Sequence, residues 1–523
     1  MTLGSVTPTS IIAMKADKDL YRQLRDLPVL ELWQVHVPRF NQLSPKERGQ
    51  QVALVRAVGV AFAESRNPEM KAAVKAWMKE LLQDPNEKVR RYAAAAIPKL
   101  GGDVEAESKL IDLMKGAQTD REKKQAASAL EKIGGKATLQ ALSQTGEKLI
   151  SEQKVRASLA RQESVGDVKL DVPVKNWRGV KLHLRCRTGL ESIVVDEIKE
   201  GEAQHQQFKV LEVRGACVVV QPLAAFTLGD LYRYRCFDTV NFVLGLVRQP
   251  ESPDAIGQLA KLIASPLTEA VMQALTDGAC RYRLMFLAKG NHEAAVKQVT
   301  ESAYRLNTRV LNDPRQAPWT VEVYQNAAGA SVELRPRLAA NPRLYYRTQA
   351  VKAASHPTIA ASLARIAGKQ ERELVWDPFC GSGLELIEAA LYGKVAQVVG
   401  TDIDPKAIAM AQANFEAAQL PGTQAQFQAV DFRDYAKIAA LKAGKVSLVI
   451  SNPPLGRQVR VPHLHGLFED LFRVAHEVLR PGGRLVFINP LRLESTYPNL
   501  RRESRRPVDL GGYECRLEVY RKY

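Results

Sequence analysis

Hydrophobic and polar positions follow three different patterns along the 523-residue chain. Up to about residue 150 the apolar positions recur with a helical period, alanine, leucine, lysine and glutamate dominate, and glycine is confined to boundaries. Over about 179–345, short alternating segments predict strands with helices between them. From residue 346, apolar runs typical of buried strands alternate with helical patterns. The predicted fold class is therefore multidomain: an α-helical region, an α+β region and a doubly wound α/β domain.

Two segments of the helical region match each other. "DPNEKVRRYAAAAIPKLGG" and "TDREKKQAASALEKIGG" share a charged opening, an alanine-rich face and a Gly-Gly stop, at an offset of 33 residues. Stacked helix pairs in a solenoid have such a period, and the pattern resembles HEAT repeats. We place the repeats at 43–150, after an N-terminal extension at 1–42 and before a linker or exposed helix at 151–178. The resemblance implies a protein partner on the repeats, and the alternative is a structural appendage.

Two segments of the α+β region resemble known RNA-modifying enzymes. "RCRTGLESIVVDEIKE" is similar to the opening strand and helix of the THUMP region with its preceding ferredoxin-like domain, and "LNDPRQAPWTVEVY" has that family's polar turn before a late strand. The resemblance is spread over residues 179–345. It implies that this region captures RNA, either a tRNA acceptor end or an rRNA stem.

Four polar residues follow the apolar strands of the last region. Asp377, Asp402, Asp431 and Asn452 are separated by 25, 29 and 21 residues, the lengths of successive strand-helix units in a parallel sheet. Ligands of such sheets bind beyond the carboxyl ends of the strands. We therefore expect these four residues to converge on one site.

The residues around the first two strand ends suit a cofactor that contains adenosine but no phosphate. Gly381 and Gly383 let the first turn approach a ligand closely, because neither has a Cβ atom. A carboxylate at Asp377 can hold the turn or receive a cationic amino group. Asp402 ends the second strand, where an acidic side chain can accept hydrogen bonds from both ribose hydroxyls.

The next two positions extend the predicted cofactor site. Ile403 can pack on the adenine, and Asp431 can accept a hydrogen bond from its exocyclic amine. The loop "DPFCGSG" is not GxGxxG and lacks the lysine of a P-loop, which argues against NAD and ATP. The candidate cofactor-binding residues are Asp377, Phe379, Gly381, Gly383, Asp402, Ile403 and Asp431.

Five motifs of this region together resemble class I S-adenosylmethionine-dependent methyltransferases. They are "SHPTIAASLARIA", "DPFCGSGLELIEAAL", "GTDIDPKAI", "NPPLG" and "VLRPGGRLVFINP". More narrowly, they resemble the THUMP-associated RNA methylases that modify guanine N2. The resemblance implies a Rossmann-like methyltransferase domain at 346–523 with S-adenosyl-L-methionine as cofactor. It also implies a methyl-acceptor loop with the catalytic residues Asn452, Pro453, Pro454 and Leu455.

The "NPP" sequence suits methylation of an exocyclic amine, whose lone pair is delocalised into the purine ring. The Asn452 side-chain oxygen and the Pro453 carbonyl can accept its two hydrogens and aim the lone pair outward. The two prolines hold these acceptors in place before the substrate binds. Positioning of this kind supplies roughly 7 to 11 kcal/mol of a barrier.

Leu455 departs from this family, which usually has an aromatic residue that stacks on the flipped base. The absence of this aromatic ring removes roughly 1 to 3 kcal/mol of stacking energy and leaves the identity of the target base open. Phe379 or Tyr497 is a candidate for the missing ring. The function expected is methylation of a guanine N2 in structured RNA. The alternatives are an N6-adenine methyltransferase of DNA or RNA and a catalytically inactive RNA-binding or assembly scaffold.

Charge favours a polyanionic partner, since the formal net charge is +17. The candidate RNA-binding residues are Arg457 and Arg460 beyond the acceptor loop, and Arg501, Arg502, Arg505 and Arg506 in a loop near the C-terminus. Six cysteines without a CxxC pair argue against a metal site or a disulfide framework. No apolar run is long enough to span a membrane, and we expect a cytoplasmic protein without a secretory signal. An organellar transit segment is the alternative for the first residues.

Overall fold

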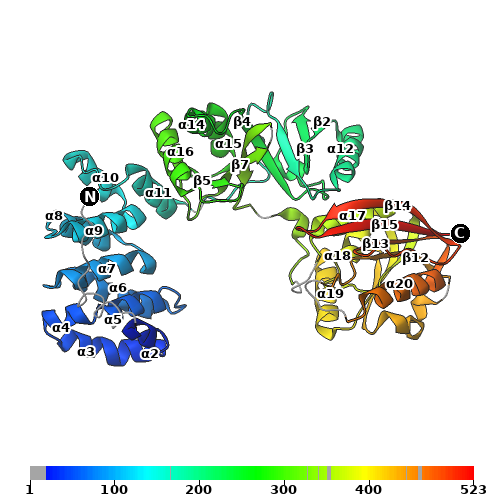
Figure 1. Cartoon of the computed structure of the whole chain (residues 1–523), viewed down its shortest axis with the longest axis horizontal. Helices are drawn as coiled ribbons and strands as arrows, with labels where there is room; N and C mark the ends of the chain where they lie inside the picture. Colours follow the sequence, from blue (N-terminus) through cyan, green and yellow to red (C-terminus); the bar gives the residue numbers. More distant parts are fainter. Residues whose placement is uncertain are drawn as a thin grey trace.

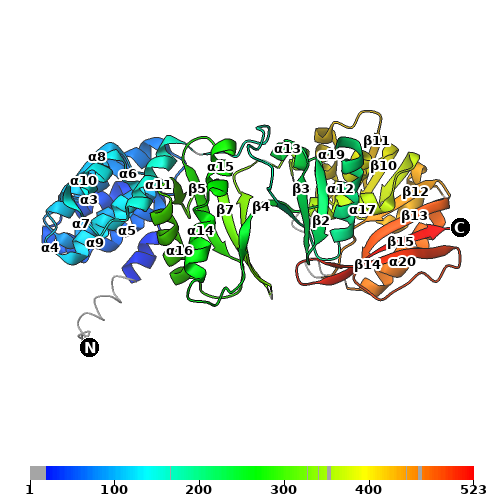
Figure 2. The ribbon, with the colours of Figure 1, turned by 90° about the horizontal axis from the view of Figure 1, so that it is seen from above.

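A computed structural model of the protein describes residues 19–164, 166–326, 328–339, 341–349, 355–442, 444–456 and 462–523. A helical stack, a mixed α/β part and a C-terminal α/β domain follow one another along its longest axis (Figure 1; Figure 2). The stack and the C-terminal domain extend to the same side of the middle part, so that the three form an arch (Figure 1).

The helical stack is built from antiparallel helix pairs, and α7 and α9 begin 33 residues apart, which confirms the predicted repeat. Their alanine-rich faces pack against each other, with Ala93 and Ala126 buried. Arg90 and Glu122 form an ion pair between successive repeats. The elements are α2 (Val29–Glu31), a π-helical turn η1 (Leu32–His36), α3 (Val37–Gln42), α4 (Pro45–Gln50), α5 (Val52–Ala61), α6 (Pro68–Leu81), α7 (Glu87–Leu100), α8 (Val104–Lys115), α9 (Asp120–Ile133), α10 (Lys136–Thr145) and α11 (Glu152–Glu163).

The helical stack extends beyond the predicted range of 43–150 at both ends. Residues 29–42 are helical, and Leu32 and Phe40 are buried in the same core as the repeats, so this part is no separate extension. Residues 152–163, expected as a linker or exposed helix, form α11, which packs on α9. The pattern of α11 was weak because it buries small side chains such as Ala157 and Ser158 rather than large apolar ones.

The middle part contains, within the described residues, an eight-stranded sheet of order β2-β3-β1-β4-β8-β7-β5-β6. The predicted strands and helices are confirmed, but the sequence analysis missed β4, which pairs with β1 and β8 and joins the two halves into one sheet. The strands are β1 (Leu182–Arg185), β2 (Phe208–Val213), β3 (Cys217–Pro222), β4 (Thr239–Val247), β5 (Cys280–Phe286), β6 (Val310–Asn312), β7 (Trp319–Asn326) and β8 (Gly329–Pro336). The helices are α12 (Glu191–His205), α13 (Leu228–Leu231), α14 (Ala255–Ile263), α15 (Pro266–Leu275), α16 (Glu293–Leu306) and the 3-10 turn η2 (Pro342–Leu344).

The C-terminal domain has, in the part of it that the structure describes, a seven-stranded sheet of order β11-β10-β9-β12-β13-β15-β14. Its first five strands are parallel, and β15 and β14 complete it in antiparallel fashion. The strands are β9 (Glu371–Asp377), β10 (Lys394–Asp402), β11 (Gln424–Ala429), β12 (Val446–Ser451), β13 (Leu479–Asn489), β14 (Leu500–Asp509) and β15 (Glu514–Lys522). The helices are α17 (Pro357–Ala367), α18 (Leu384–Tyr392), α19 (Pro405–Ala418) and α20 (Leu464–Val478), with the 3-10 turns η3 (Phe432–Lys437) and η4 (Ala439–Leu441).

Helices cover both faces of this sheet, as the continuous apolar runs in its strands predict. Val375 and Leu448 share a core with α17, α18 and α19, whereas Trp376 and Val449 belong to the core under α20. Successive strand residues point to opposite faces, so each strand contributes to both cores. The predicted doubly wound α/β domain is confirmed.

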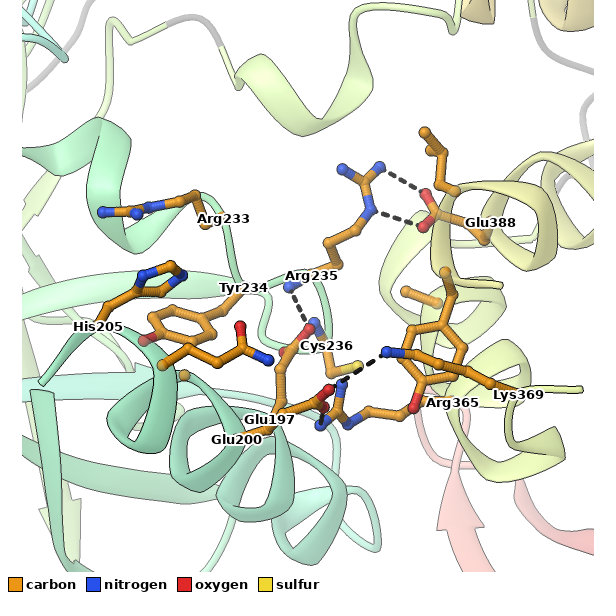
Figure 3. Close-up of a pocket in the computed structure, with 15 residues that line it drawn as sticks. Glu197, Glu200, His205, Arg233, Tyr234, Arg235, Cys236, Arg365, Lys369 and Glu388 are labelled. Carbon is orange, nitrogen blue, oxygen red and sulfur yellow. Dashed lines mark hydrogen bonds and ion pairs between the residues drawn. The ribbon is translucent and has the colours of Figure 1, made fainter. Parts of the chain in front are cut away.

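The middle part and the C-terminal domain share one hydrophobic core and a polar seam. Figure 3 shows this seam, where Arg235 forms two hydrogen bonds with Glu388, at 2.7 and 2.8 Å, and Arg365 pairs with Glu200 beside a cavity of about 240 Å³. At Gly189, a Cβ atom would lie 1.9 Å from the carbonyl oxygen of a β14 residue, so only glycine allows this close approach. The seam fixes the middle sheet relative to the C-terminal domain.

Candidate active site

The predicted site residues lie at the carboxyl ends of adjacent strands. Asp377 ends β9 and Asn452 follows β12, its neighbour in the sheet. The chain runs outward from β9 through β10 and β11 on one side, and then returns to β12 on the other side. Ligands of open α/β sheets bind at this point of reversal. The expected convergence of the strand ends is therefore built into the topology.

Asp377 is fully buried and ties the two strand ends together. Its Oδ1 atom accepts hydrogen bonds from the Ser451 hydroxyl at 2.6 Å and from the Phe379 backbone N–H at 3.0 Å. Its Oδ2 atom is buried without a hydrogen-bond partner among the described residues. Burial, with the nearby Glu385 and Asp402 carboxylates, raises the pKa of Asp377 well above its ordinary value. A cationic group beside Oδ2 would relieve this cost.

Glu385 is a second buried carboxyl at the site, and the sequence analysis did not single it out. It lies in the first turn of α18, directly after the glycine-rich loop, and is 3% exposed. Burial raises the pKa of Glu385 to about 7. Its Oε1 atom has no hydrogen-bond partner in the described part of the chain. The available signal was a glutamate in the first turn of a mostly apolar helix.

Ser355 links Glu385 to the acceptor loop. Its Oγ atom accepts a hydrogen bond from Asn452 Nδ2 at 2.9 Å, and its hydroxyl also bonds the Glu385 carboxylate. The amide nitrogen of Asn452 is thus engaged. The other end of the amide, Oδ1, is buried and has no partner among the residues that the structure describes. A buried acceptor left in this state is expected to receive a donor from a ligand.

The glycine-rich turn and the end of β10 form the other side of the site. Gly381 and Gly383 have φ angles of +50° and +83°, which favour glycine. Asp402 accepts from the Gly381 N–H through Oδ2 and from the Asp404 N–H through Oδ1, both at 3.0 Å. A carboxylate has about four acceptor positions, so Asp402 retains capacity for two hydroxyls. Ile403 beside it is 77% exposed, so its side chain is accessible to a ligand.

Asp431 lies at the third strand end, where it caps η3 and pairs with Arg433 at 3.0 Å. A hydrogen bond from an adenine amine would have to share this carboxylate with the guanidinium. Phe379 packs on Phe432, with ring centroids 4.8 Å apart. It therefore lies on the Asp431 side of the site, as expected of a residue that contacts the cofactor rather than the methyl acceptor.

The acceptor loop contains two buried or half-buried prolines and a half-buried Leu455. Tyr497 is one of the two rings considered as a substitute for the aromatic residue that is usual at position 455. It stacks on His476 of α20, with ring centroids 4.4 Å apart, so its ring already has a partner. Tyr513, in the turn between β14 and β15, donates its hydroxyl to the Leu455 carbonyl at 3.4 Å. Sequence reasoning missed this tyrosine, because no local pattern relates the turn to the acceptor loop.

The candidate RNA-binding arginines fall into two groups. Arg457 and Arg460 lie outside the described residues. The segment with the others, predicted as a loop, is the edge strand β14, and this prediction was wrong. The reason is that carboxylates of neighbouring segments pair with these arginines: Arg505 bonds Glu518 of β15 at 2.7 Å, and Arg502 pairs with Glu494, which precedes β14. Arg501 donates a hydrogen bond to the Pro498 carbonyl, and Arg506 donates one to the Ser192 hydroxyl.

The residues present fit S-adenosylmethionine. Two buried carboxyls with unpaired oxygens, Asp377 and Glu385, suit its cationic amino group, Asp402 suits the ribose hydroxyls, and exposed Ile403 suits the adenine. In the described residues, no group of three or more His, Cys, Asp or Glu side chains is arranged to hold a metal ion. Likewise, the described helices include none with the length and apolarity needed to cross a bilayer.

Comparison with protein families matches two parts of the chain. Residues 345–497 match the RMKL-like methyltransferase domain, and residues 74–159 match HEAT repeats. A crystal structure of TrmN from Thermus thermophilus superposes with a TM-score of 0.52 at 22% identity, covering 66% of this chain and all of that one. This likeness concerns the fold, and the C-terminal domain has the fold of S-adenosylmethionine-dependent methyltransferases.

Curated relatives match shorter stretches. A tRNA (guanine(10)-N2)-dimethyltransferase of Methanocaldococcus jannaschii is 31% identical over 140 residues, 26% of this chain and 38% of its own length. A tRNA (guanine(6)-N2)-methyltransferase of Thermus thermophilus is 28% identical over 257 residues, 47% of this chain and 74% of its own. The bovine U6 snRNA (guanine-N(2))-methyltransferase THUMPD2 is 29% identical over 149 residues, 28% of this chain and 27% of its own. The parts of this chain that resemble known families are therefore residues 74–159, which match HEAT repeats, and residues 345–497, which match the RMKL-like methyltransferase domain.

Proposed function

We propose that this protein transfers a methyl group from S-adenosylmethionine to the exocyclic N2 amine of a guanine in structured RNA, with tRNA as the first candidate and rRNA as the second. One observation carries the proposal: Asn452 presents a buried, unpartnered Oδ1 atom at the strand end next to the unpartnered Oδ2 atom of Asp377, within the described residues. The relatives named as guanine-N2 methyltransferases of tRNA and snRNA support the choice of base.

The chain's own residues have three tasks in this reaction. Asp377 and Glu385 hold the amino group of the cofactor, which supplies an electrophilic methyl group when it is bound. Asn452 Oδ1 and the Pro453 carbonyl accept the two hydrogens of the guanine amine. The lone pair is then aimed away from both acceptors. A general base is not needed for attack, because the nitrogen loses a proton readily once it carries a positive charge.

The hydrogen bond between Asn452 and Ser355 determines the orientation of the Asn452 amide. By engaging Asn452 Nδ2 at 2.9 Å, it turns the oxygen of the amide, rather than the nitrogen, toward the acceptor position. An amide in the opposite orientation would present N–H donors to an amine that itself donates. Pre-orientation of this kind reduces the reorganisation needed in the transition state.

RNA as substrate is supported by the charge of the chain and by the middle part. The net charge of +17 attracts a polyanion, and the eight-stranded sheet of the described middle residues lies between the repeats and the site. The assignment of this part as THUMP-like, its capture of RNA and a cytoplasmic location belong to the same proposal. An inactive scaffold would have no reason to keep two buried carboxyls that each have one oxygen without a hydrogen-bond partner in the described structure.

The test is to incubate the purified protein with labelled S-adenosylmethionine and RNA from cells that lack its gene, and to identify the modified nucleoside by mass spectrometry. We expect N2-methylguanosine, and no product with Asn452→Ala, although this variant should bind the cofactor nearly as well. Asn326→Ala, the same change at an exposed strand end, is the control. N6-methyladenosine as the product, or full activity of Asn452→Ala, would overturn the proposal.

A further inference from the structure

A second large cavity lies far from the methyl-acceptor loop, between the helical stack and the middle part. Its walls are the end of α9, the segment 148–161 with α11, and α16 with the residues that follow β6. In Figure 1 and Figure 2, α11 and α16 lie side by side at this junction. Its volume is about 1460 Å³. Pockets for small molecules usually measure roughly 300 to 1,000 Å³, so the size favours a macromolecular ligand.

The charge of this groove is positive. Its described lining includes seven lysine and arginine side chains and four glutamates. Glu131 is paired with Lys154 at 2.7 Å, and Glu152 with Arg156. Five of the cations have no ion pair or hydrogen bond of their side chain within the described residues: Lys132, Lys148, Lys297, Arg305 and Arg315.

Two of these cations, Lys132 and Arg315, also lie close enough for Arg315 to act on Lys132. Burial and the positive charges of Arg315, Lys99 and Lys154 lower the pKa of Lys132. Burial and the charge of Arg161 lower the pKa of Arg315. Glu131 and Asp313 offset part of this repulsion, and like charges held together destabilise a protein unless an anion binds between them. This crowding therefore indicates a site that is completed by a negatively charged ligand.

The groove also has a fixed shape and a buried donor. Arg161 of α11 bonds Asp313, a fully buried residue after β6, at 2.7 Å, and Arg281 of β5 bonds the same carboxylate at 3.1 Å. These bonds hold the two walls together. Gln153 is 7% exposed, and its Nε2 atom has no acceptor among the described residues. A buried N–H group without a partner beside unpaired cations suits a phosphate oxygen.

We infer that the groove between α11 and α16 binds the sugar-phosphate backbone of RNA, with Lys132, Lys297 and Arg315 as the principal phosphate contacts. The repeats then serve as one wall of an RNA site, rather than as a docking surface for protein. The inference rests on the proposed function only in taking RNA as the polyanion. The groove lies where the helical stack meets the middle part, and the acceptor loop lies in the C-terminal domain at the other end of the middle part (Figure 1), so a bound RNA is held at two places.

The experiment measures affinity rather than methyl transfer, so it can fail independently of the proposed function. The probe is fluorescently labelled bulk tRNA, titrated with full-length protein at several salt concentrations, by anisotropy. The variant is Lys132→Gln/Lys297→Gln/Arg315→Gln. Each phosphate contact contributes about 0.7 to 0.9 to the slope of log Kd against log salt. We expect the slope to fall by about 2 and Kd to rise at least tenfold near physiological salt.

The matched control is Lys46→Gln/Lys115→Gln/Lys209→Gln, which removes the same charge at exposed positions outside the groove. It should leave the slope nearly unchanged. Both triple variants should bind S-adenosylmethionine and melt like the wild type, which excludes misfolding. Equal slopes and affinities for the two triple variants would overturn the inference and leave an acidic protein as the ligand of the groove. Arg315→Glu provides a second test of RNA affinity, because reversal of the charge should weaken RNA binding more than Arg315→Gln does.

Discussion

Asn452 Nδ2 donates a hydrogen bond to Ser355 Oγ at 2.9 Å, across 97 residues of sequence. Ser355 precedes α17, whereas Asn452 follows β12, and the two meet because α17 packs on the sheet face that contains β12. The bond determines which end of the Asn452 amide is available to a ligand. A residue outside the recognised motif therefore controls the acceptor chemistry.

We expect Ser355→Ala to lower kcat about tenfold with little change in KM for RNA. Without the hydroxyl, the amide can rotate, and one lost hydrogen bond of about 1.4 kcal/mol corresponds to a factor of ten. Steady-state kinetics with the RNA substrate measure both constants. Ser143→Ala, which removes an exposed hydroxyl, is the control. A wild-type kcat for Ser355→Ala would show that the bond does not orient Asn452.

The affinity for the cofactor should rise as Glu385 becomes ionised with increasing pH. The pKa of Glu385 is raised to about 7, so below this pH the carboxyl is protonated and cannot attract the amino group of the cofactor. We expect the affinity for S-adenosylmethionine to increase from pH 5.5 to pH 7, below the range in which the cofactor's own amino group loses its proton. Because the bound cation favours the ionised carboxylate, binding near pH 6.5 should release protons.

Isothermal titration calorimetry in buffers of different ionisation enthalpy measures this proton release. Glu385→Gln should reduce it and flatten the pH profile, whereas the same change at the exposed Glu416 should not. Proton uptake on binding, or an identical profile for Glu385→Gln, would contradict the placement of the amino group.

The sequence predicted those parts of the protein whose signals are local. The 33-residue repeat marks α7 and α9, and the apolar runs that end at Asp377 and Asn452 mark two adjacent strands. Ser355 and Tyr513 could not be found in this way. Their roles depend on contacts between segments distant in the sequence, and their neighbours show no chemical pattern.

Two errors have identifiable physical causes. The helix α11 was misread because small residues such as Ala157 fill its interface, so the hydrophobic period is faint. The strand β14 was misread because its basic residues indicated solvent, whereas Arg505 is paired across the strands with Glu518, which is fully buried. Charge runs can form edge strands when the adjacent strand supplies carboxylates.

The seam between the middle part and the C-terminal domain should be sensitive to Arg235. Its removal leaves Glu388, 2% exposed, without its cation, since Tyr346 supplies only a hydrogen bond. We expect Arg235→Met to destabilise the protein by about 3 to 5 kcal/mol. Denaturant unfolding followed by tryptophan fluorescence measures the shift.

The double variant Arg235→Met/Glu388→Gln should recover part of this loss, because the buried charge is then removed. Arg214→Met breaks an exposed pair with Glu212 and should cost at most about 1 kcal/mol. Equal effects of Arg235→Met and Arg214→Met would mean that the seam pair contributes no more than a surface pair.

Tyr513 should take over the contact with the target base that Leu455 cannot make. Its hydroxyl reaches the Leu455 carbonyl at 3.4 Å, which holds the ring beside the acceptor loop. A stacked base contributes roughly 1 to 3 kcal/mol, so Tyr513→Ala should lower kcat/KM for RNA by about tenfold to a hundredfold. Tyr513→Phe retains the ring and should stay within about threefold of the wild type. If both variants lose activity equally, the hydroxyl rather than the ring is required.

The central claim is that the acceptor loop acts on the N2 amine of guanine. Once the methylated position has been mapped, the most direct measurement is methyl transfer to an RNA in which that guanosine is replaced by inosine, which lacks only this amine. Asn452 Oδ1 would then have no amine to orient, and we predict that transfer falls to background while RNA affinity is retained. Methylation of the inosine RNA at the rate of the guanosine RNA would contradict the account.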